Sequence, residues 1–457
     1  MITYSIIKKS ELEGSLRLDA EYYQPEYLSI RNKLFSSPTL GDISKKITDF
    51  GAYSQMNFVE YTETGVRFLR NQDIGDSFIE DSEPIYISGE TYKKLSLKLE
   101  EYDILTPRVG TIGAAAVVFR DSLPASANQN LAQVKPDINK IDPVYLAVFL
   151  NSKFGHSQFD QFATGNVQPW LNLYQIKSIK IFVPPKNIQE SVKSLALKVL
   201  EEKNKSKSFY SQAENLLLEE IGVKKDISSY PIYNVVNFSE IKKVNRMDAE
   251  YFQLGPFRFG ELTSITDYKV KPLAEVIKYV PAKFDPAKEP NKSFKYVELS
   301  NINSSIGVID GFSEVLGKYV PSRAKRVLKT GDVLVSSVQG SLGKVALVEK
   351  DQQGHLASTG FFQFRSKEIL PEALLVLTKS TFFQSQLERR CAGTILTAVP
   401  KESIKDIFIP VISKPTQQKI AELVKKSHES CKKAKALLEE AKHKVEQLIE
   451  NLQSTLV

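Results

Sequence analysis

The chain has 457 residues, of which 42% are hydrophobic and 25% are charged, and its formal net charge is +7. This composition is typical of a globular protein with ample side chains for a core. No apolar run approaches the roughly 20 residues of a membrane-spanning helix, and the N-terminus shows no signal segment, so we expect a cytoplasmic protein. The two cysteines, Cys391 and Cys431, and the four histidines are scattered, which argues against a disulfide framework or a cysteine/histidine metal site.

The sequence repeats itself once, with an offset of 229 residues, so that Arg17 corresponds to Arg246 and Asp103 to Asp332. Each copy covers about half of the chain, which is enough for a separate domain. Solenoid repeats are shorter and need three or more copies. We therefore interpret the chain as a tandem pair of similar domains.

The charge is shared unevenly between the two copies. Residues 1–228 contain 27 basic and 29 acidic side chains, and residues 229–457 contain 34 and 25, so the halves have net charges of −2 and +9. A positive half favours nucleic acid, which is bound through phosphate contacts. Because the first half is close to neutral, charge by itself does not establish a nucleic-acid partner.

Each copy begins with a β-rich region. Residues 40–185 alternate short Val, Ile, Tyr and Phe segments with Gly, Pro, Asn and Asp turns, which indicates a mixed domain with many strands. Pro184 and Pro185 end this region in the first copy, and Pro410 and Pro415 end it in the second. We predict an α+β fold class in which two mixed α/β domains are repeated in tandem.

A long helix follows each β-rich region. Its apolar side chains recur at spacings of three and four in a narrow seam, which Glu202 and Ser206 interrupt in the first copy and Ser427 in the second. A helix lying on its own domain is one reading, but a narrow seam favours pairing of the two helices as a coiled coil. The predicted seam residues are Val192, Leu195, Val199, Phe209, Leu216, Ile420, Val424, Leu438, Val445 and Leu448.

This layout, two β-rich regions each closed by proline and a long helix, resembles the DNA specificity subunit of type I restriction-modification systems. The resemblance covers nearly the whole chain. It is carried by the Asp-Ile-Leu segment at 103–113 and its repeat at 331–343, by the stretches 68–74 and 128–131, and by the proline-then-glutamine starts of both helices. The order and the duplication of these segments are the specific part of the likeness.

The resemblance implies a non-catalytic subunit that reads a bipartite DNA site. Residues 1–186 and 229–411 would be two target recognition domains, and residues 187–228 and 412–457 would be long helices, the conserved spacer regions, paired antiparallel. Two copies of a methylation subunit would dock on the chain, carry S-adenosylmethionine and methylate adenine at N6. A translocating restriction subunit would join them, and this chain itself would hold no cofactor.

The residues agree with a role that is not catalytic. The sequence has no Asn-Pro-Pro-aromatic segment to receive a flipped adenine, and it has no P-loop or glycine-rich cofactor loop. Two other classes of function stay open at this point. One is a self-sufficient methyltransferase or nuclease, against which the missing motifs argue, and the other is a duplicated protein-interaction scaffold that does not read DNA sequence.

Base reading needs side chains with donors and acceptors that reach groove edges, such as Arg for guanine and Asn or Gln for adenine. Clusters of these side chains occur in the turns of both β-rich regions. For any one of them the alternative is a solvated or capping side chain in a turn. The predicted DNA-binding residues are Arg67, Arg70, Asn71, Gln72, Arg108, Thr111, Asn128, Gln129, Asn130, Lys292, Lys295, Asn301, Asn303, Ser336, Gln339, Ser341 and Lys344.

Comparison of the copies separates shared from differing residues. Arg17 and Arg246 are shared, with the acidic and aromatic residues that follow them, and they indicate either a duplicated surface for two identical partner subunits or a duplicated salt-bridged helix start. Residues 128–130 and 358–360 differ, so we expect them to specify different bases. Trp170 has no counterpart in the second copy, and we expect it in the core.

Overall fold

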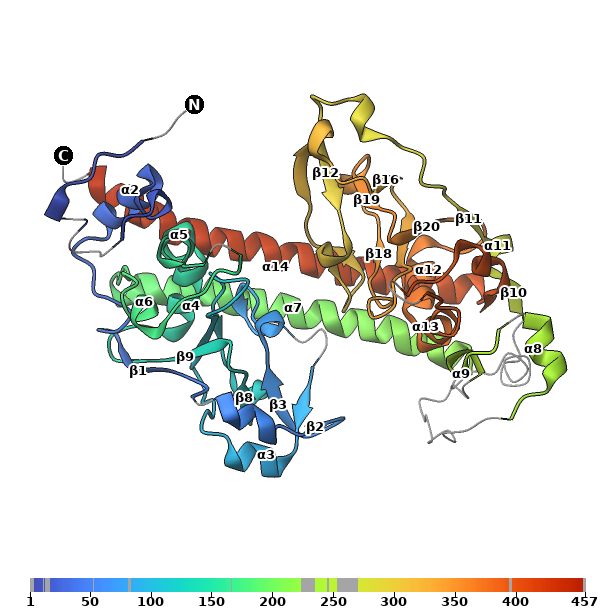
Figure 1. Ribbon diagram of the computed structural model, residues 1–457, viewed down its shortest axis with the longest axis horizontal. Helices are drawn as coiled ribbons and strands as arrows, with labels where there is room; N and C mark the ends of the chain where they lie inside the picture. Colours follow the sequence, from blue (N-terminus) through green and yellow to red (C-terminus); the bar gives the residue numbers. More distant parts are fainter. Residues whose placement is uncertain are drawn as a thin grey trace. The chain divides into compact units, whose positions relative to one another are not determined.

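The computed structural model describes residues 4–10, 12, 17–51, 53–80, 84–165, 167–222, 235–244, 246–252, 270–393 and 397–454. The chain divides into two compact units, which we call the first unit (residues 1–202 and 432–457) and the second unit (residues 203–431). Two long helices, α7 (Lys186–Glu220) and α14 (Lys414–Ser454), each contribute to both units (Figure 1).

The first unit contains a five-stranded sheet in the order β1-β9-β6-β7-β4 and a four-stranded sheet in the order β2-β5-β3-β8. Both sheets are mixed, because β4 pairs parallel with β7 and β3 with β8, while the other neighbours are antiparallel. The strands are β1 (Ser44–Asp49), β2 (Tyr61–Thr62), β3 (Val66–Leu69), β4 (Ser77–Phe78), β5 (Tyr86–Ile87), β6 (Ile104–Pro107), β7 (Ala116–Val117), β8 (Ala125–Ala127) and β9 (Leu131–Pro136).

Short helices pack on the larger sheet of the first unit. They are α2 (Pro25–Lys33), α4 (Pro143–Asn151), α5 (Lys153–Phe162) and α6 (Leu173–Lys177), and α3 (Gly89–Lys94) lies among the strands in the sequence. Helix α4 is buried along almost its whole length and begins at a cap, since Asp142 Oδ1 accepts from the backbone of Val144 at 2.9 Å. One core joins α4 and the sheet to the buried face of the long helices, which includes Val192 and Val445.

The second unit repeats this plan with a six-stranded sheet (β11-β20-β17-β18-β14-β13), a four-stranded sheet (β15-β12-β19-β16) and a two-stranded sheet (β10-β21). The strands are β10 (Val270–Pro272), β11 (Ile277–Tyr279), β12 (Ser293–Val297), β13 (Ile302–Asn303), β14 (Val308–Ile309), β15 (Ser313–Leu316), β16 (Ala324–Val327), β17 (Asp332–Ser336), β18 (Val345–Leu347), β19 (Leu356–Ser358), β20 (Phe361–Ser366) and β21 (Phe408–Pro410). The predicted pair of mixed α/β domains is thereby confirmed.

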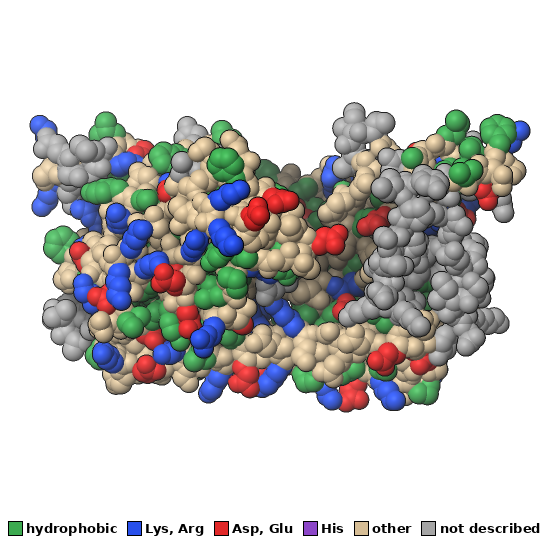
Figure 2. All heavy atoms as spheres, turned by 90° about the horizontal axis from the view of Figure 1, so that it is seen from below, with side chains coloured by type: hydrophobic (Ala, Val, Ile, Leu, Met, Phe, Trp, Pro, Cys, Tyr) green, Lys and Arg blue, Asp and Glu red, His purple; other side chains and the backbone are tan. Residues whose placement is uncertain are grey.

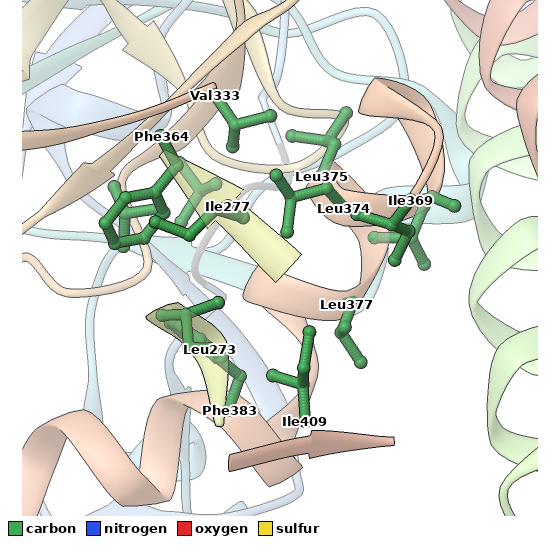
Figure 3. Packing of buried hydrophobic residues seen from close by; sticks show 14 of the residues in the cluster. Leu273, Ile277, Val333, Phe364, Ile369, Leu374, Leu375, Leu377, Phe383 and Ile409 are labelled. Carbon is green, nitrogen blue, oxygen red and sulfur yellow. The ribbon is translucent and has the colours of Figure 1, made fainter. Parts of the chain in front are cut away.

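The helices of the second unit are α8 (Phe238–Val244), α9 (Ala249–Phe252), α11 (Leu273–Val276), α12 (Pro371–Lys379) and α13 (Thr381–Glu388). Of these, α11 and α12 contact strands of the six-stranded sheet. Figure 3 shows side chains of α11, α12 and α13 directed toward those of the strands, with Leu375 of α12 close to Val333 of β17. The same core includes residues of α7 and α14.

The two long helices run antiparallel, as expected. In the first unit Ser191 is paired with Lys444, and Glu202 with Lys433, so residue numbers rise along one helix as they fall along the other. At about 1.5 Å per residue, the 35 residues of α7 and the 41 of α14 extend roughly 52 and 62 Å.

The polar residues that interrupt the predicted seams face each other across the helix pair. Ser206 Oγ donates to the carbonyl of Ser427 at 2.7 Å, and Ser427 Oγ donates to the carbonyl of Ser206 at 2.8 Å. Lys433 Nζ donates to Glu202 Oε1 at 2.8 Å. All three interrupting residues are buried, so they belong to the helix interface and are satisfied within it.

Six of the predicted seam residues are buried and four are only partly buried. The partly buried ones are Leu195, Phe209, Leu216 and Leu448. Their neighbours Tyr210, Leu217 and Ile449 are buried instead. An α-helix drifts by about 20° per heptad against a strict seven-residue pattern, so the buried stripe moves by one position along a long helix. The buried residues also pack on the domain cores, and each helix contributes residues to the core of each unit.

A glutamine at the start of each long helix ties it to its unit. Gln189 accepts from the backbone of Asp142 at 2.8 Å and donates to the carbonyl of Pro184 at 2.8 Å. Gln417 accepts from the backbone of Leu370 at 2.9 Å and donates to the carbonyl of Ile412, just before α14, at 2.9 Å. The glutamine-rich helix starts noted in the sequence therefore have a structural role.

Candidate nucleic-acid interface

Four segments of the first unit meet at one end of its sheets. The backbone of Arg108 donates to Asn130 at 2.7 Å, and that of Gly110 donates to Pro169 at 2.9 Å. Asn71 Nδ2 donates to the carbonyl of Val109 at 2.7 Å. We call residues 70–72, 108–113, 128–130, 164–165 and 167–171 the first loop cluster.

The second unit builds a matching cluster with the same bonds. The backbone of Ser337 donates to Gly360 at 2.9 Å, and that of Gln339 donates to Thr397 at 2.9 Å. Gly360 lies against Leu299, because a methyl group added at this glycine would be 3.7 Å from a Leu299 methyl. We call residues 298–301, 337–343, 358–360, 392–393 and 397–399 the second loop cluster. Two equivalent surfaces made of loops are thus held by two rigid scaffolds.

A short hairpin borders each cluster. Thr164 and Trp170 exchange two backbone hydrogen bonds, as do Ala392 and Ala398. Trp170 is 44% exposed, so the expectation that it lies in the core is wrong. A bridge between its backbone and Val109 keeps it at the edge of the loop cluster. Where the second copy lacks a tryptophan it has Leu396 or its neighbours, and Leu396 lies outside the described residues.

Both arginines of the first cluster make internal ion pairs. Arg70 Nε is 3.1 Å from Asp73 Oδ2, and the Asp73 side chain is 2% exposed. Arg108 is paired with Asp49, and it also donates to the carbonyl of Leu171 at 3.3 Å. Their guanidinium groups therefore stabilise the loops through internal bonds, and any DNA contact would use the donors that remain.

Several predicted amide and hydroxyl readers also hold turns. Asn128 Oδ1 accepts from the backbone of Asn130 at 3.1 Å, and Asn303 Oδ1 accepts from Ser305 at 3.1 Å. Ser336 Oγ accepts from the backbone of Val338 at 3.2 Å and lies 3.1 Å from Ser341 Oγ. These bonds are the turn and capping role that the sequence left open as the alternative to DNA contact.

Other predicted readers are exposed. Gln72, Thr111 and Gln339 lie in the loop clusters with exposed side chains. Gln129 and Asn130 are partly buried, and Arg67 lies on β3, where its guanidinium donates to the carbonyl of Glu80 at 3.4 Å.

The predicted lysines lie on or beside the strands of the second unit. Lys295 Nζ is 4.6 Å from the centre of the Phe312 ring, and Lys292 Nζ is 2.7 Å from Glu289. Lys344 donates to the carbonyl of Ile302 at 3.1 Å, so it braces the loop that follows Asn301. The structure therefore places Lys292 and Lys295 outside the second loop cluster as we define it.

The shared arginines anchor the N-terminal segment of each copy. The Arg17 guanidinium donates to both carboxylate oxygens of Asp19 at 2.6 and 2.5 Å and to two carbonyls at the end of α5. Arg246 does the same with Asp248 at 2.8 and 2.6 Å. These hydrogen bonds raise the pKa of both guanidinium groups and lower the pKa of both carboxyls. The salt-bridged reading of these residues is therefore observed.

The repeated aspartates of the Asp-x-Leu segments are buried and structural. Asp103 accepts from Gln133 Nε2 at 2.5 Å, and burial raises its pKa. Asp332 accepts from Gln363 Nε2 at 2.6 Å and also forms two bonds with the guanidinium of Arg365, at 2.7 and 2.8 Å. The segment that carries the sequence resemblance thus serves the sheets behind the loop clusters.

Sequence reasoning missed Glu298, an exposed residue of the second loop cluster. The equivalence of Glu298 to Arg70 appears only when β3 is aligned with β12. Both strands lead into a four-residue 3-10 turn, in which the side chain of the fourth residue accepts from the backbone of the first. An offset of 228 at this point, in place of 229, brings Glu298 opposite Arg70.

The face in Figure 2 shows lysine and arginine side chains interspersed with aspartate and glutamate. This mixture of charges agrees with the moderate net charge of the chain. Within the described ranges, no helix is long and apolar enough to cross a membrane, and no group of three or more His, Cys, Asp or Glu side chains is suited to a metal ion.

Comparison with known proteins gives related matches. The type I restriction enzyme HindI specificity subunit of Haemophilus influenzae is 23% identical over 176 residues, a match that covers 35% of this chain and 35% of that protein. A crystal structure of a type I restriction-modification S subunit from M. genitalium is 13% identical and covers 91% of this chain and 95% of that chain, with a TM-score of 0.42. The HsdS subunit from Thermoanaerobacter tengcongensis is 14% identical and covers 90% and 94%, with a TM-score of 0.29.

The match to a protein family is broader and follows the repeat. Residues 36–213 and residues 265–443 each match the type I restriction modification DNA specificity domain. The two matched segments contain most of the strands and a large part of both long helices, so the match extends over the architecture described above. The chain therefore belongs to the type I restriction modification DNA specificity domain family, with two copies of that domain.

Proposed function

We propose that this chain is the non-catalytic, sequence-specific DNA-binding subunit of a type I restriction-modification complex. The observation that carries the proposal is the pair of matching loop clusters, held by equivalent backbone bonds but lined by different side chains. The first presents mainly amides and the second mainly hydroxyls and glycines. Two scaffolds with the same backbone structure but different side chains on their surfaces are suited to reading two different half-sites.

On this proposal, residues 1–186 and 229–411 are the two target recognition domains, and residues 187–228 and 412–457 are the spacer helices. Helices α7 and α14 begin at Lys186 and Lys414, close to these limits, while residues 223–228 lie outside the described part of the chain. The predicted DNA-binding residues that lie in the two loop clusters form the proposed reading surfaces together with Glu298, whereas Lys292 and Lys295 lie outside the second cluster.

We further propose that two copies of a methylation subunit bind the chain, carry S-adenosylmethionine and methylate adenine at N6, with a translocating restriction subunit able to join. The repeat supports two equal docking places. Leu18 and Met247, which are equivalent, are 86% and 80% exposed, and Ile6 and Val235 are 89% and 87% exposed. Apolar side chains exposed at the same positions of both copies suit a partner that binds twice in the same way.

A gel-shift assay tests this function. The purified chain alone and the chain with its methylation subunit are titrated against duplexes that contain the methylated motif and against random duplexes, in moderate salt. Because the first half has a net charge of −2, the chain alone should bind weakly and the complex tightly and selectively. Equal affinity of the complex for all duplexes would refute sequence reading. Calorimetric binding of S-adenosylmethionine to the chain alone would refute the assignment of the cofactor to the partner.

A further inference from the structure

The two loop clusters contain the same kind of turn, but the side chain that precedes it is a hydrogen-bond donor in the first cluster and an acceptor in the second. Arg70 precedes the 3-10 turn Asn71–Asp73 after β3, and Glu298 precedes the turn Leu299–Asn301 after β12. Strands β3 and β12 hold the same place in their sheets, since each pairs parallel with the strand that leads to the third loop of its cluster. Arg70 and Glu298 therefore occupy equivalent positions.

The two turns are closed by the same bond. Asp73 Oδ2 accepts from the backbone of Arg70 at 2.7 Å, and Asn301 Oδ1 accepts from the backbone of Glu298 at 2.9 Å. This bond uses the fourth residue of the turn and the backbone of the first, so it does not depend on the first side chain. The first and fourth residues can be exchanged between the units as a set without loss of the closing bond.

The side chains at the first position are oriented by their own turns. Asp73, which is buried, holds one edge of the Arg70 guanidinium, and the Arg70 side chain is 25% exposed. Ser300 Oγ donates to Glu298 Oε1 at 2.9 Å, and Glu298 is exposed. A side chain that its own turn already orients loses less conformational freedom when it binds.

We propose that positions 70 and 298 are specificity-determining residues for the two half-sites, an inference that rests on the proposed function. A guanidinium carries only donors and matches the O6 and N7 acceptors of guanine, whereas a carboxylate carries only acceptors and matches the N4 amino group of cytosine. Arg70 reads a guanine in the half-site of the first unit. Glu298 reads a cytosine in the half-site of the second unit.

The test is methylome sequencing of a host that carries the complete restriction-modification system with wild-type or variant chain. The variant E298R/N301D rebuilds the first turn in the second unit, and R70E/D73N makes the reverse exchange. Each double variant should change the preferred base at one position of one half-site, with a shift in discrimination of roughly 10- to 100-fold, and should leave the other half-site unchanged.

The control is E422K/K426E, which reverses an exposed ion pair of 2.7 Å on α14, a helix that contributes no residue to either loop cluster. It should keep the wild-type motif. The conservative E298Q keeps an acceptor and adds a donor, so it should move the preference at one position from cytosine toward adenine. This variant tests the proposal even where a double variant fails to fold, which circular dichroism detects.

The outcomes separate the inference from the proposed function. An unchanged motif with retained methylation in both E298Q and a folded double variant overturns the inference, as does a change that affects both half-sites. A wild-type system that yields no bipartite motif overturns the proposed function itself. A new base at one position of the expected half-site supports both.

Discussion

The buried aspartates of the two copies should respond differently to the same substitution, although they are equivalent in sequence. Asp332 is fully buried and binds the Arg365 guanidinium through two bonds, whereas no arginine among the described residues pairs with Asp103. At the position of Arg365 the first copy has Lys135, which pairs with Glu100 at 2.6 Å. The substitutions Asp332→Asn and Asp103→Asn therefore compare a buried ion pair with a buried carboxylate held by neutral donors.

The magnitudes follow from the partners that each change leaves behind. Asp332→Asn replaces the carboxylate that accepts from Arg365 and Gln363 with an uncharged amide, so that Arg365 loses its ion-pair partner. Removal of one member of a buried pair costs about 3–5 kcal/mol, and we expect about 3 kcal/mol because the Arg365 side chain is 33% exposed. Asp103→Asn loses a hydrogen bond but also removes a buried charge, so it should cost about 1 kcal/mol or less at neutral pH.

Thermal unfolding of the full chain can distinguish the two units, because the single tryptophan, Trp170, lies in the first unit. With Asp332→Asn, circular dichroism should show part of the transition moving down by roughly 6–12 °C, while tryptophan fluorescence changes less. Asp103→Asn should move the fluorescence transition by a few degrees at most. Equal shifts for the two variants, or a cost below 1 kcal/mol for Asp332→Asn, would refute this reasoning.

The pH dependence supplies a second readout for Asp103. Its folded-state pKa is raised above the ordinary value of 3.8, mainly by burial. A group with a raised folded pKa stabilises the protein fully below the unfolded value, and this contribution is lost as pH rises through the folded value. The cost of Asp103→Asn should thus be larger near pH 3–4 than at pH 7, which denaturant unfolding at several pH values measures.

Three further expectations concern the helices and their attachment. Ser206→Ala and Ser427→Ala each remove one buried hydroxyl bond across the helix pair and should each cost about 1 kcal/mol in urea unfolding, whereas no change would mean that the bonds do not contribute. Gln417→Ala leaves the backbone amide of the partly buried Leu370 without its acceptor and should cost about 1–3 kcal/mol, while the exposed Gln418 offers a control that should change stability by less than about 0.5 kcal/mol. Burial lowers the pKa of Lys379 from its ordinary value of 10.5 to about 8. Between these two pH values the unfolded chain binds more protons than the folded chain, so stability should rise with pH across this window. Lys379→Met should abolish the rise and stabilise the protein at pH 7 by about 1–2 kcal/mol.

Much of the fold could be predicted because its signals are periodic or repeated. The offset of 229 residues predicts two similar domains, and the helix seams predict the long helices. What Glu202, Ser206 and Ser427 do could not be predicted, because their partners lie more than 200 residues away and depend on the register of the helix pair. The sequence shows only that polar residues stand in an apolar seam.

The candidate site could be predicted less well, since side-chain type does not reveal which groups are already bonded. Arg108 is a suitable base-reading residue by type, but one of its guanidinium nitrogens donates to Asp49, which is 59 residues away in the sequence. Trp170 was expected in the core because large aromatic residues are usually buried, yet its hairpin holds it at the edge of a loop cluster. Glu298 was missed because its equivalence to Arg70 depends on the alignment of two strands.

Methylome sequencing after domain exchange tests the central claim most directly. Residues 40–185 are replaced by the corresponding region of another family member, and the methylated motif is determined in a host that carries the complete system. We predict that one half-site changes while the other half-site keeps its bases. An unchanged motif, or a change in both half-sites, would contradict the assignment of one half-site to each unit.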